Sequence, residues 1–171
     1  MPNGPWGKNM VGQTDGNVRI LRAEERDLPA VLQLQYLAFR SEAERCGCEI
    51  PPLRQTLEEL KGEYVRGFIA KAVDGEGRLV GSVRAVREGE SVLVGKLMVH
   101  PDHRGKGLGR ALLGAIERAV PGRRYELFTS ALSQSNIALY TSCGYAAYRE
   151  DAVAGVLLVW MEKKAAAGNA F

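Results

Sequence analysis

One stretch of the sequence restricts the fold more than any other: a strand pattern that enters a glycine-rich turn and leaves it as an amphipathic helix. The strand pattern covers residues 91–99, and the turn that follows has glycine at positions 105, 107 and 109. Apolar residues then recur at helical spacing: Leu108, Ala111, Leu112, Ala115, Ile116 and Ala119. Pro121 and Gly122 end the pattern. The sequence therefore predicts a helix that begins directly at a glycine turn.

A helix that begins in this way is suited to binding an anion. Its first backbone N–H groups have no partners within the helix, and its N-terminus has a partial positive charge. The three glycines let a ligand approach the main chain, and Arg104, Lys106 and Arg110 add positive charge. We interpret the turn as a phosphate site, although the same glycines would also suit a tight connection that binds nothing.

Two common phosphate-binding motifs do not fit this turn. The P-loop pattern requires Ser or Thr after its Lys, whereas Gly107 follows Lys106. The dinucleotide fingerprint requires a third glycine where this chain has Arg110, and the strands before the turn form a meander instead of a parallel unit. Nucleoside-triphosphate and dinucleotide enzymes are therefore disfavoured.

The remaining patterns predict an α+β fold with one mixed, mostly antiparallel sheet of six to seven strands packed by about four helices. Strand patterns cover residues 17–22, 65–73, 78–86, 91–99, 125–129, 145–150 and 156–163. Helix patterns cover residues 27–43, 56–63, 108–119 and 133–143. The longest apolar stretch, residues 152–161, is about half as long as a membrane-spanning helix and predicts a buried strand.

The length of 171 residues, with 46% hydrophobic and 25% charged residues, is typical of a single domain. We predict a flexible leader over residues 1–16, the domain over 17–164 and a short tail over 165–171. The leader lacks the apolar core of a signal peptide, so we expect a cytoplasmic protein. The net charge is only +3, and the charged residues are scattered along the chain. We therefore expect neither nucleic acid nor a membrane as a partner.

The three cysteines and two histidines do not form a complete set of zinc ligands. Cys46, Cys48 and Cys143 are an odd number, and His100 and His103 flank a Pro-Asp pair. We therefore expect neither a disulfide nor a metal site. The histidines fit solvated turn residues, and a role as catalytic base is the alternative.

Two motifs together resemble one family. Arg104, Gly107 and Gly109 before a Leu-rich helix resemble the R/Q-x-x-G-x-G/A motif of the GNAT superfamily of N-acetyltransferases, and residues 135–145 resemble its second signature, with Asn136 and Tyr140 on a helix before a Gly-Tyr pair. The resemblance covers residues 18–163 and agrees with the predicted order of elements. It implies an acyltransferase that transfers the acetyl group of acetyl-CoA to a primary amine of an unidentified small molecule or peptide.

The resemblance also implies where acetyl-CoA binds: in a V-shaped opening between the strand that ends at Val99 and the strand over residues 125–129. The pantetheine arm would pair with the first of these strands, and the pyrophosphate would lie on the glycine turn. The implied cofactor-binding residues are Leu97, Met98, Val99, Arg104, Gly105, Lys106, Gly107, Leu108, Gly109, Arg110 and Asn136. Tyr140, one helical turn after Asn136, would protonate the leaving thiolate.

The implied reaction is direct attack of a neutral amine on the thioester, with a backbone N–H near Val99 stabilising the oxyanion. Many members of the family have a Glu on the strand over residues 91–99, but its inner half has no carboxylate here. The base therefore stays unassigned: a water relay, a group in the loop over residues 46–56, or none. Glu42, Glu44 and Glu49 fit a solvated surface or an anionic rim that attracts an amine.

Other interpretations stay open. Tyr140 would also fit a core aromatic residue, and Asn136 a hydrogen bond at the helix start. An inactive CoA-binding sensor or interaction module of the same fold would explain the missing strand Glu. A nucleotide-binding protein with the same glycine turn is the alternative from another class, and dimerisation is suggested by family analogy alone.

Overall fold

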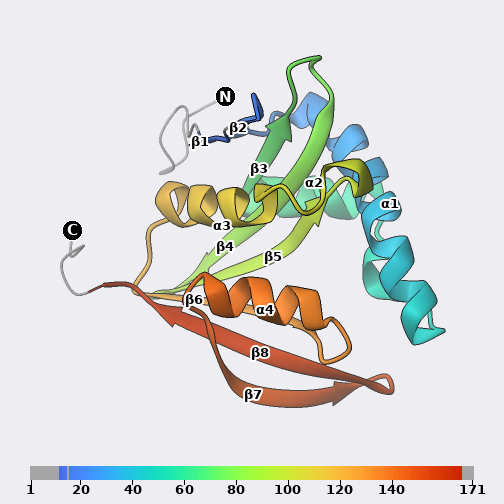
Figure 1. Ribbon diagram of the computed structural model, residues 1–171, viewed down its shortest axis with the longest axis vertical. Helices are drawn as coiled ribbons and strands as arrows, with labels where there is room; N and C mark the ends of the chain where they lie inside the picture. Colours follow the sequence, from blue (N-terminus) through green and yellow to red (C-terminus); the bar gives the residue numbers. More distant parts are fainter. Residues whose placement is uncertain (1–11, 15, 167–171) are drawn as a thin grey trace.

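An eight-stranded sheet runs through the molecule in the order β1-β2-β3-β4-β5-β6-β8-β7 (Figure 1). The computed structural model describes residues 12–14 and 16–166. The strands are β1 Gly12–Gln13, β2 Arg19–Arg22, β3 Phe68–Val73, β4 Leu79–Glu88, β5 Ser91–Val99, β6 Arg124–Ser130, β7 Ala146–Val153 and β8 Val156–Lys164. The helices are α1 Leu28–Cys46, α2 Leu57–Arg66, α3 Leu108–Ala119 and α4 Gln134–Ser142.

The pairing pattern confirms the predicted α+β class and the mixed, mostly antiparallel sheet. Every pair of neighbouring strands is antiparallel except β5 and β6, which are parallel. The two-residue β1 adds an eighth strand to the six or seven predicted, and it lies ahead of residue 17, where we placed the start of the domain. Most of the predicted leader and tail, residues 1–11, 15 and 167–171, lies outside the described residues. No helix in the described part of the chain is long and apolar enough to cross a membrane.

Helices cover the sheet on two faces and divide the core in two (Figure 1). On one face, α3 buries the apolar stripe that the sequence predicted, with Leu112 and Ile116 fully enclosed beside α4. On the other face, α1 and α2 bury Leu28, Val31 and Leu60 against Met98 of β5. Because β5 carries residues of both clusters, it lies at the centre of the molecule.

The predicted start of α2 is confirmed, but its predicted end is wrong. Thr56 and Glu59 form the expected capping box, in which each side chain accepts a hydrogen bond from the other residue's backbone N–H. The helix then continues to Arg66, so Val65 and Gly67 do not belong to the strand that we predicted from residue 65. Val65 is 81% exposed on the last helical turn. A β-branched residue favours a strand only when its neighbours bury it.

We predicted one buried strand over the apolar stretch 152–161, and this prediction is wrong. The stretch contains parts of two strands joined by a turn. Ala154 and Gly155 have positive φ values of 50° and 79°, and they reverse the chain between β7 and β8. Val153 and Leu157, on either side of this turn, are exposed. Hydrophobicity alone does not locate such a turn, whereas the left-handed backbone at Gly155 permits it.

The expectation of no disulfide is also wrong. α1 extends to Cys46 instead of ending near Ala43, and Gly47 then adopts a left-handed conformation with φ 64°. This turn brings the Cα atoms of Cys46 and Cys48 within 5.2 Å, and their sulfur atoms are bonded. Cys143 is free.

The V-shaped opening lies between β5 and β6. These strands pair only from Ser91 to Leu93 on β5, and then separate. In addition, β5 contains a bulge opposite β4: Gly95 faces Arg84, and Met98 faces Ser82, so two residues of β5 occupy the space opposite one residue of β4. Lys96 within this bulge has a positive φ of 50°. The separation leaves backbone groups of β5 facing the opening.

Candidate active site

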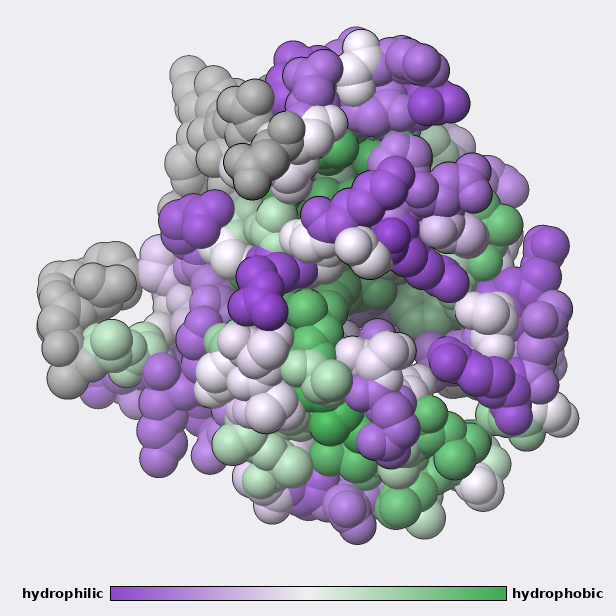
Figure 2. Space-filling view, viewed as in Figure 1, coloured by the Kyte–Doolittle hydropathy of each residue, from purple (hydrophilic) through white to green (hydrophobic). Residues whose placement is uncertain are grey.

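A cavity of about 890 Å³ occupies the opening and reaches from α1, across β5, to the N-terminus of α3 and the start of α4. In Figure 2 the surface is hollowed in this region, with apolar residues in the hollow and hydrophilic residues around its rim. The predicted residues that line it are Leu97, Met98, Val99, Arg104, Gly105, Gly107, Leu108, Gly109, Arg110 and Asn136. Lys106 and Tyr140 do not line it. The tertiary structure thus brings together all but two of the predicted site residues.

The glycine turn presents unpaired N–H groups to this cavity. The first hydrogen bond of α3 joins the N–H of Ala111 to the carbonyl of Gly107 at 3.1 Å. The backbone N–H groups of residues 105–110 donate no hydrogen bond to any group in the described part of the chain. Gly105 and Gly107 have φ values of 72° and 80°, a conformation that other residues adopt only with strain. The geometry therefore provides the anion site that the sequence suggested.

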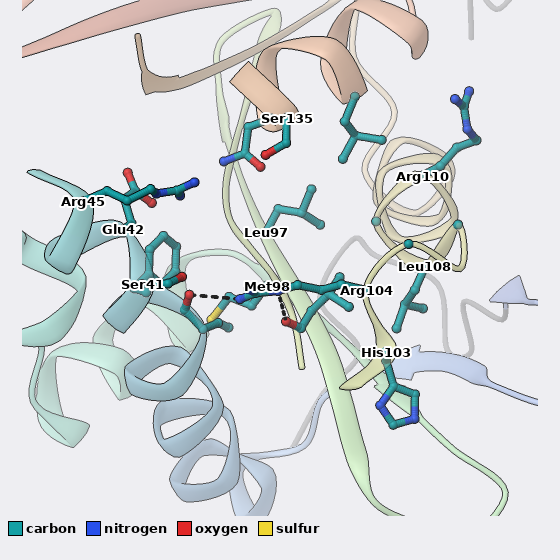
Figure 3. Close-up of a pocket in the computed structure, with 18 of the residues that line it drawn as sticks. Ser41, Glu42, Arg45, Leu97, Met98, His103, Arg104, Leu108, Arg110 and Ser135 are labelled. Atoms are coloured by element: carbon teal, nitrogen blue, oxygen red, sulfur yellow. Dashed lines mark hydrogen bonds between the residues drawn. The ribbon is translucent and has the colours of Figure 1, made fainter. Parts of the chain in front are cut away.

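The cationic side chains near the turn make hydrogen bonds within the protein. Arg104 donates to the carbonyls of Val99 at 3.3 Å and Ala38 at 3.2 Å (Figure 3, dashed lines). Arg110 points away from Leu97 and donates to the carbonyl and hydroxyl of Ser142 (Figure 3). Lys106 donates to the carbonyl of Asp102. Arg104 thus connects the turn with α1 and the end of β5, Arg110 connects α3 with the end of α4, and Lys106 bonds within the turn itself.

Gly109 has a packing role that sequence reasoning missed. A Cβ atom added there would come within 3.1 Å of the Cδ2 atom of Leu139 on α4. We predicted that this glycine lets a ligand approach the main chain. It also lets α3 and α4 approach each other, on either side of the cavity.

Tyr140 is buried on α4 and does not line the cavity. Its side chain is 7% exposed, and Asn136 and Leu139 of the same helix face the cavity. Its hydroxyl makes no hydrogen bond with any described residue. Burial raises the pKa of Tyr140, and the charge of Glu42 raises it further, so the phenol is protonated at neutral pH. Asn136 donates to the hydroxyl of Thr129 at 3.3 Å.

The opposite wall of the cavity comes from α1, whose Glu42 and Glu44 we considered as part of an anionic rim. Ala38, Phe39, Ser41, Glu42, Glu44 and Arg45 line it. Figure 3 shows Glu42 and Arg45 on one side of Leu97 and Arg110 on the other. Burial raises the pKa of Glu42, and the nearby charge of Arg45 partly opposes this effect. Glu42 and Glu44 of the suggested rim line this wall, whereas Glu49 does not, and sequence reasoning missed the contributions of Ala38, Phe39, Ser41 and Arg45.

His103 also lines the cavity and is more enclosed than a solvated turn residue. Its side chain is 21% exposed, and its Nε2 atom lies 4.0 Å from a carboxylate oxygen of Asp74. Its Nδ1 atom is buried and has no partner in the described part of the chain. In Figure 3 the ring points away from Leu97, so His103 lies far from the central part of β5.

A buried polar cluster holds the loop after α1 against the sheet, and sequence reasoning missed it. Arg84 of β4 donates to Glu63 of α2 at 2.6 Å, to Gln55 at 2.9 Å and to Gln35 of α1. Gln35 in turn donates to the carbonyl of Pro52 at 2.7 Å. These contacts fix α1, α2 and the loop between them. Burial lowers the pKa of the neighbouring Lys96, with Arg84 adding to the effect and Glu63 opposing it.

Comparison with known proteins is consistent with this geometry. Residues 65–147 match the family model described as an acetyltransferase (GNAT) domain. A curated relative, the UPF0157 protein YqkA of Bacillus subtilis (strain 168), is 28% identical over 117 residues, which is 67% of this chain and 33% of that protein. The chain therefore matches about a third of the length of this relative.

Solved structures share the fold. The PaiA N-acetyltransferase of Thermoplasma acidophilum, in complex with coenzyme A, has a TM-score of 0.71 and 17% identity, with 86% of this chain and 99% of that chain covered. The ribosomal-protein-S18-alanine N-acetyltransferase of Escherichia coli has a TM-score of 0.70 and 19% identity, with 90% and 99% covered. At these identities the likeness establishes the architecture and leaves the substrate open.

Proposed function

Because residues 65–147 match the model of a GNAT acetyltransferase domain, we propose that the chain is a member of that superfamily and transfers the acetyl group of acetyl-CoA to a primary amine. The observation that carries the proposal is the cavity between β5 and β6, which ends at the unpaired N–H groups of the glycine turn. An elongated substrate with phosphates at one end and a thioester at the other fits this arrangement. The amine belongs to a small molecule or peptide whose identity is open.

In this proposal, the residues of the cavity have separate roles in binding acetyl-CoA. The N–H groups of residues 105–110 bind the pyrophosphate, with support from the positive charges of Arg104, Lys106 and Arg110. Leu97, Met98 and Val99 pair with the pantetheine arm through their backbone groups, because the edge of β5 that faces β6 has no strand partner there. Asn136 contacts the pantetheine or thioester end. This arrangement holds the thioester beside β5 for attack.

Tyr140 acts as the general acid in this proposal. Its hydroxyl is protonated at neutral pH and has no partner in the described part of the chain, so it is free to donate to the sulfur. A backbone N–H near Val99 stabilises the oxyanion that forms when the amine attacks.

Calorimetric titration with acetyl-CoA, with ATP and NAD as controls, tests the donor site. We expect saturable binding of acetyl-CoA only, and loss of binding in Gly107→Glu, which puts a carboxylate at the anion site. The matched control is Gly77→Glu, because Gly77 also has a positive φ, of 81°, but lies in the turn between β3 and β4. Equal binding of ATP, or none of acetyl-CoA, would refute the proposal.

A second candidate function is an inactive CoA-binding module. It is favoured by one observation: the inner half of β5, Leu93 to Leu97, contains no carboxylate that could act as a base. Thiol release from acetyl-CoA in the presence of amines separates the two, since the module would bind acetyl-CoA without accelerating release. A cytoplasmic location and a homodimer stay predictions, and the Cys46–Cys48 disulfide adds no support to the former, because disulfides are rare in the cytosol.

A further inference from the structure

Glu42 lies where two cavities meet. It lines the large cavity together with Leu97 and Asn136, and it also lines a small cavity of about 20 Å³ between the end of α1 and the segment that joins β6 to α4. The other residues around the small cavity are Arg45, Cys46, Ile50, Ser130, Leu132, Ser133 and Val156. Glu42 therefore lies between the proposed thioester position and the end of α1, on the side away from the phosphate turn.

The carboxylate of Glu42 is partly buried and available. It forms no hydrogen bond and no salt bridge with any residue that the structure describes. The ionisable groups that face it are Arg45 on the same helix and Tyr140 on α4, and the residues around it from β6, the β6–α4 segment and β8 are not ionisable. Glu44 also lines the large cavity, but it is exposed to solvent.

Its position supplies the group that β5 lacks. The inner half of β5 has no carboxylate, and Glu90 lies in the turn before the strand begins. Among the residues around the large cavity, the carboxylates are Glu42 and Glu44, both on α1. Partial burial raises the pKa of Glu42 and so makes it a better proton acceptor than an exposed Glu.

Resting on the proposed function, we propose that Glu42 is the general base of the reaction. One carboxylate oxygen takes a proton from the acceptor's ammonium group, and the freed nitrogen lone pair forms a bond to the acetyl carbon. The carbon–sulfur bond then breaks, and Tyr140 gives its proton to the sulfur. The second proton that leaves the nitrogen restores Tyr140. The products are the amide, CoA and one proton, which Glu42 releases to water.

The test compares Glu42→Gln with Glu88→Gln, the same change at an exposed carboxylate of β4 that does not line the cavity. The probe is n-butylamine, a minimal primary amine, and thiol release from acetyl-CoA is followed from pH 6 to pH 10. We expect Glu42→Gln to lower kcat at neutral pH about 100-fold or more, the usual contribution of a general base. The acidic limb of its kcat/KM profile should disappear, and calorimetric affinity for acetyl-CoA should not change. Glu88→Gln should behave as wild type.

Glu42→Asp separates a chemical role from a structural one, because it keeps the carboxylate and shortens the side chain by one methylene. We expect it to keep the acidic limb at a reduced rate. Wild-type rate and pH profile in Glu42→Gln would overturn the proposal, and so would a wild-type protein that binds acetyl-CoA but does not accelerate thiol release. Failure of the wild type to bind acetyl-CoA would instead overturn the proposed function.

Discussion

Tyr140 and Tyr145 are buried tyrosines whose ring centroids lie 6.2 Å apart, but their hydroxyl groups have different surroundings. The hydroxyl of Tyr145 donates to a carboxylate oxygen of Glu117 at 2.8 Å, whereas that of Tyr140 donates to no described residue. Replacing each by Phe removes the same single oxygen from the same kind of ring. The two variants should therefore separate a structural hydroxyl from a catalytic one.

The structure sets the size of each effect. A hydrogen bond to a charged group contributes about 1.5–3 kcal/mol, so Tyr145→Phe should lose this much free energy of unfolding. For a chain of this length, the melting temperature should fall by about 3–12 °C, at about 2–4 °C for each kcal/mol. Tyr140→Phe breaks no hydrogen bond among the described residues and should change stability by less than about 0.5 kcal/mol. Its kcat should fall about 10²–10⁴-fold through loss of the general acid.

Urea unfolding at pH 7 and thiol release with n-butylamine measure the two effects on the same proteins, and calorimetry with acetyl-CoA checks that the donor site is intact. Tyr145→Phe should keep the wild-type kcat. The reasoning would be refuted if Tyr140→Phe destabilised the protein as much as Tyr145→Phe, because its hydroxyl would then be structural. Equal turnover of Tyr140→Phe and wild type would refute its assignment as acid.

Two further predictions concern the glycine turn and Glu42. Gly107→Ala should lower the free energy of unfolding, measured with urea, by about 1–2 kcal/mol. The φ value there is 80° and an added Cβ atom meets no atom within 4 Å, so the cost is backbone strain alone. An unchanged urea midpoint would contradict this prediction. The pKa of Glu42 is raised in the folded state, so the folded state binds this proton more tightly than the unfolded chain does. As the pH rises above 4.5, the ordinary pKa of a Glu side chain, the ionisation of Glu42 therefore lowers the free energy of unfolding. The free energy of unfolding of Glu42→Gln should therefore rise relative to that of the wild type between pH 4 and pH 8. A difference between the two proteins that does not change with pH would disprove the raised pKa of Glu42.

Features that depend on neighbours in the sequence could be predicted. The capping box of Thr56 and Glu59 and the buried stripe of α3 follow from contacts three or four residues apart. The left-handed backbone of Gly107 and Gly144 is of the same kind, because it depends on the glycine itself. These local rules located the turn and most of the donor site, and with the family resemblance they indicated the chemistry.

Features that depend on distant contacts could not be predicted. Nothing within the local sequence of Val65 shows that it stays exposed on a helix, and the sequence left open whether Glu42 lies on a solvated surface or at the cavity. Arg104 donates to Ala38 across 66 positions of the chain, and Arg84 donates to Gln35 across 49. The sequence by itself determined the helix, the turn and the unpaired N–H groups, since hydrogen bonding and backbone conformation there are local. The tertiary structure alone decided which carboxylates line the cavity, because that depends on how α1 packs against β5.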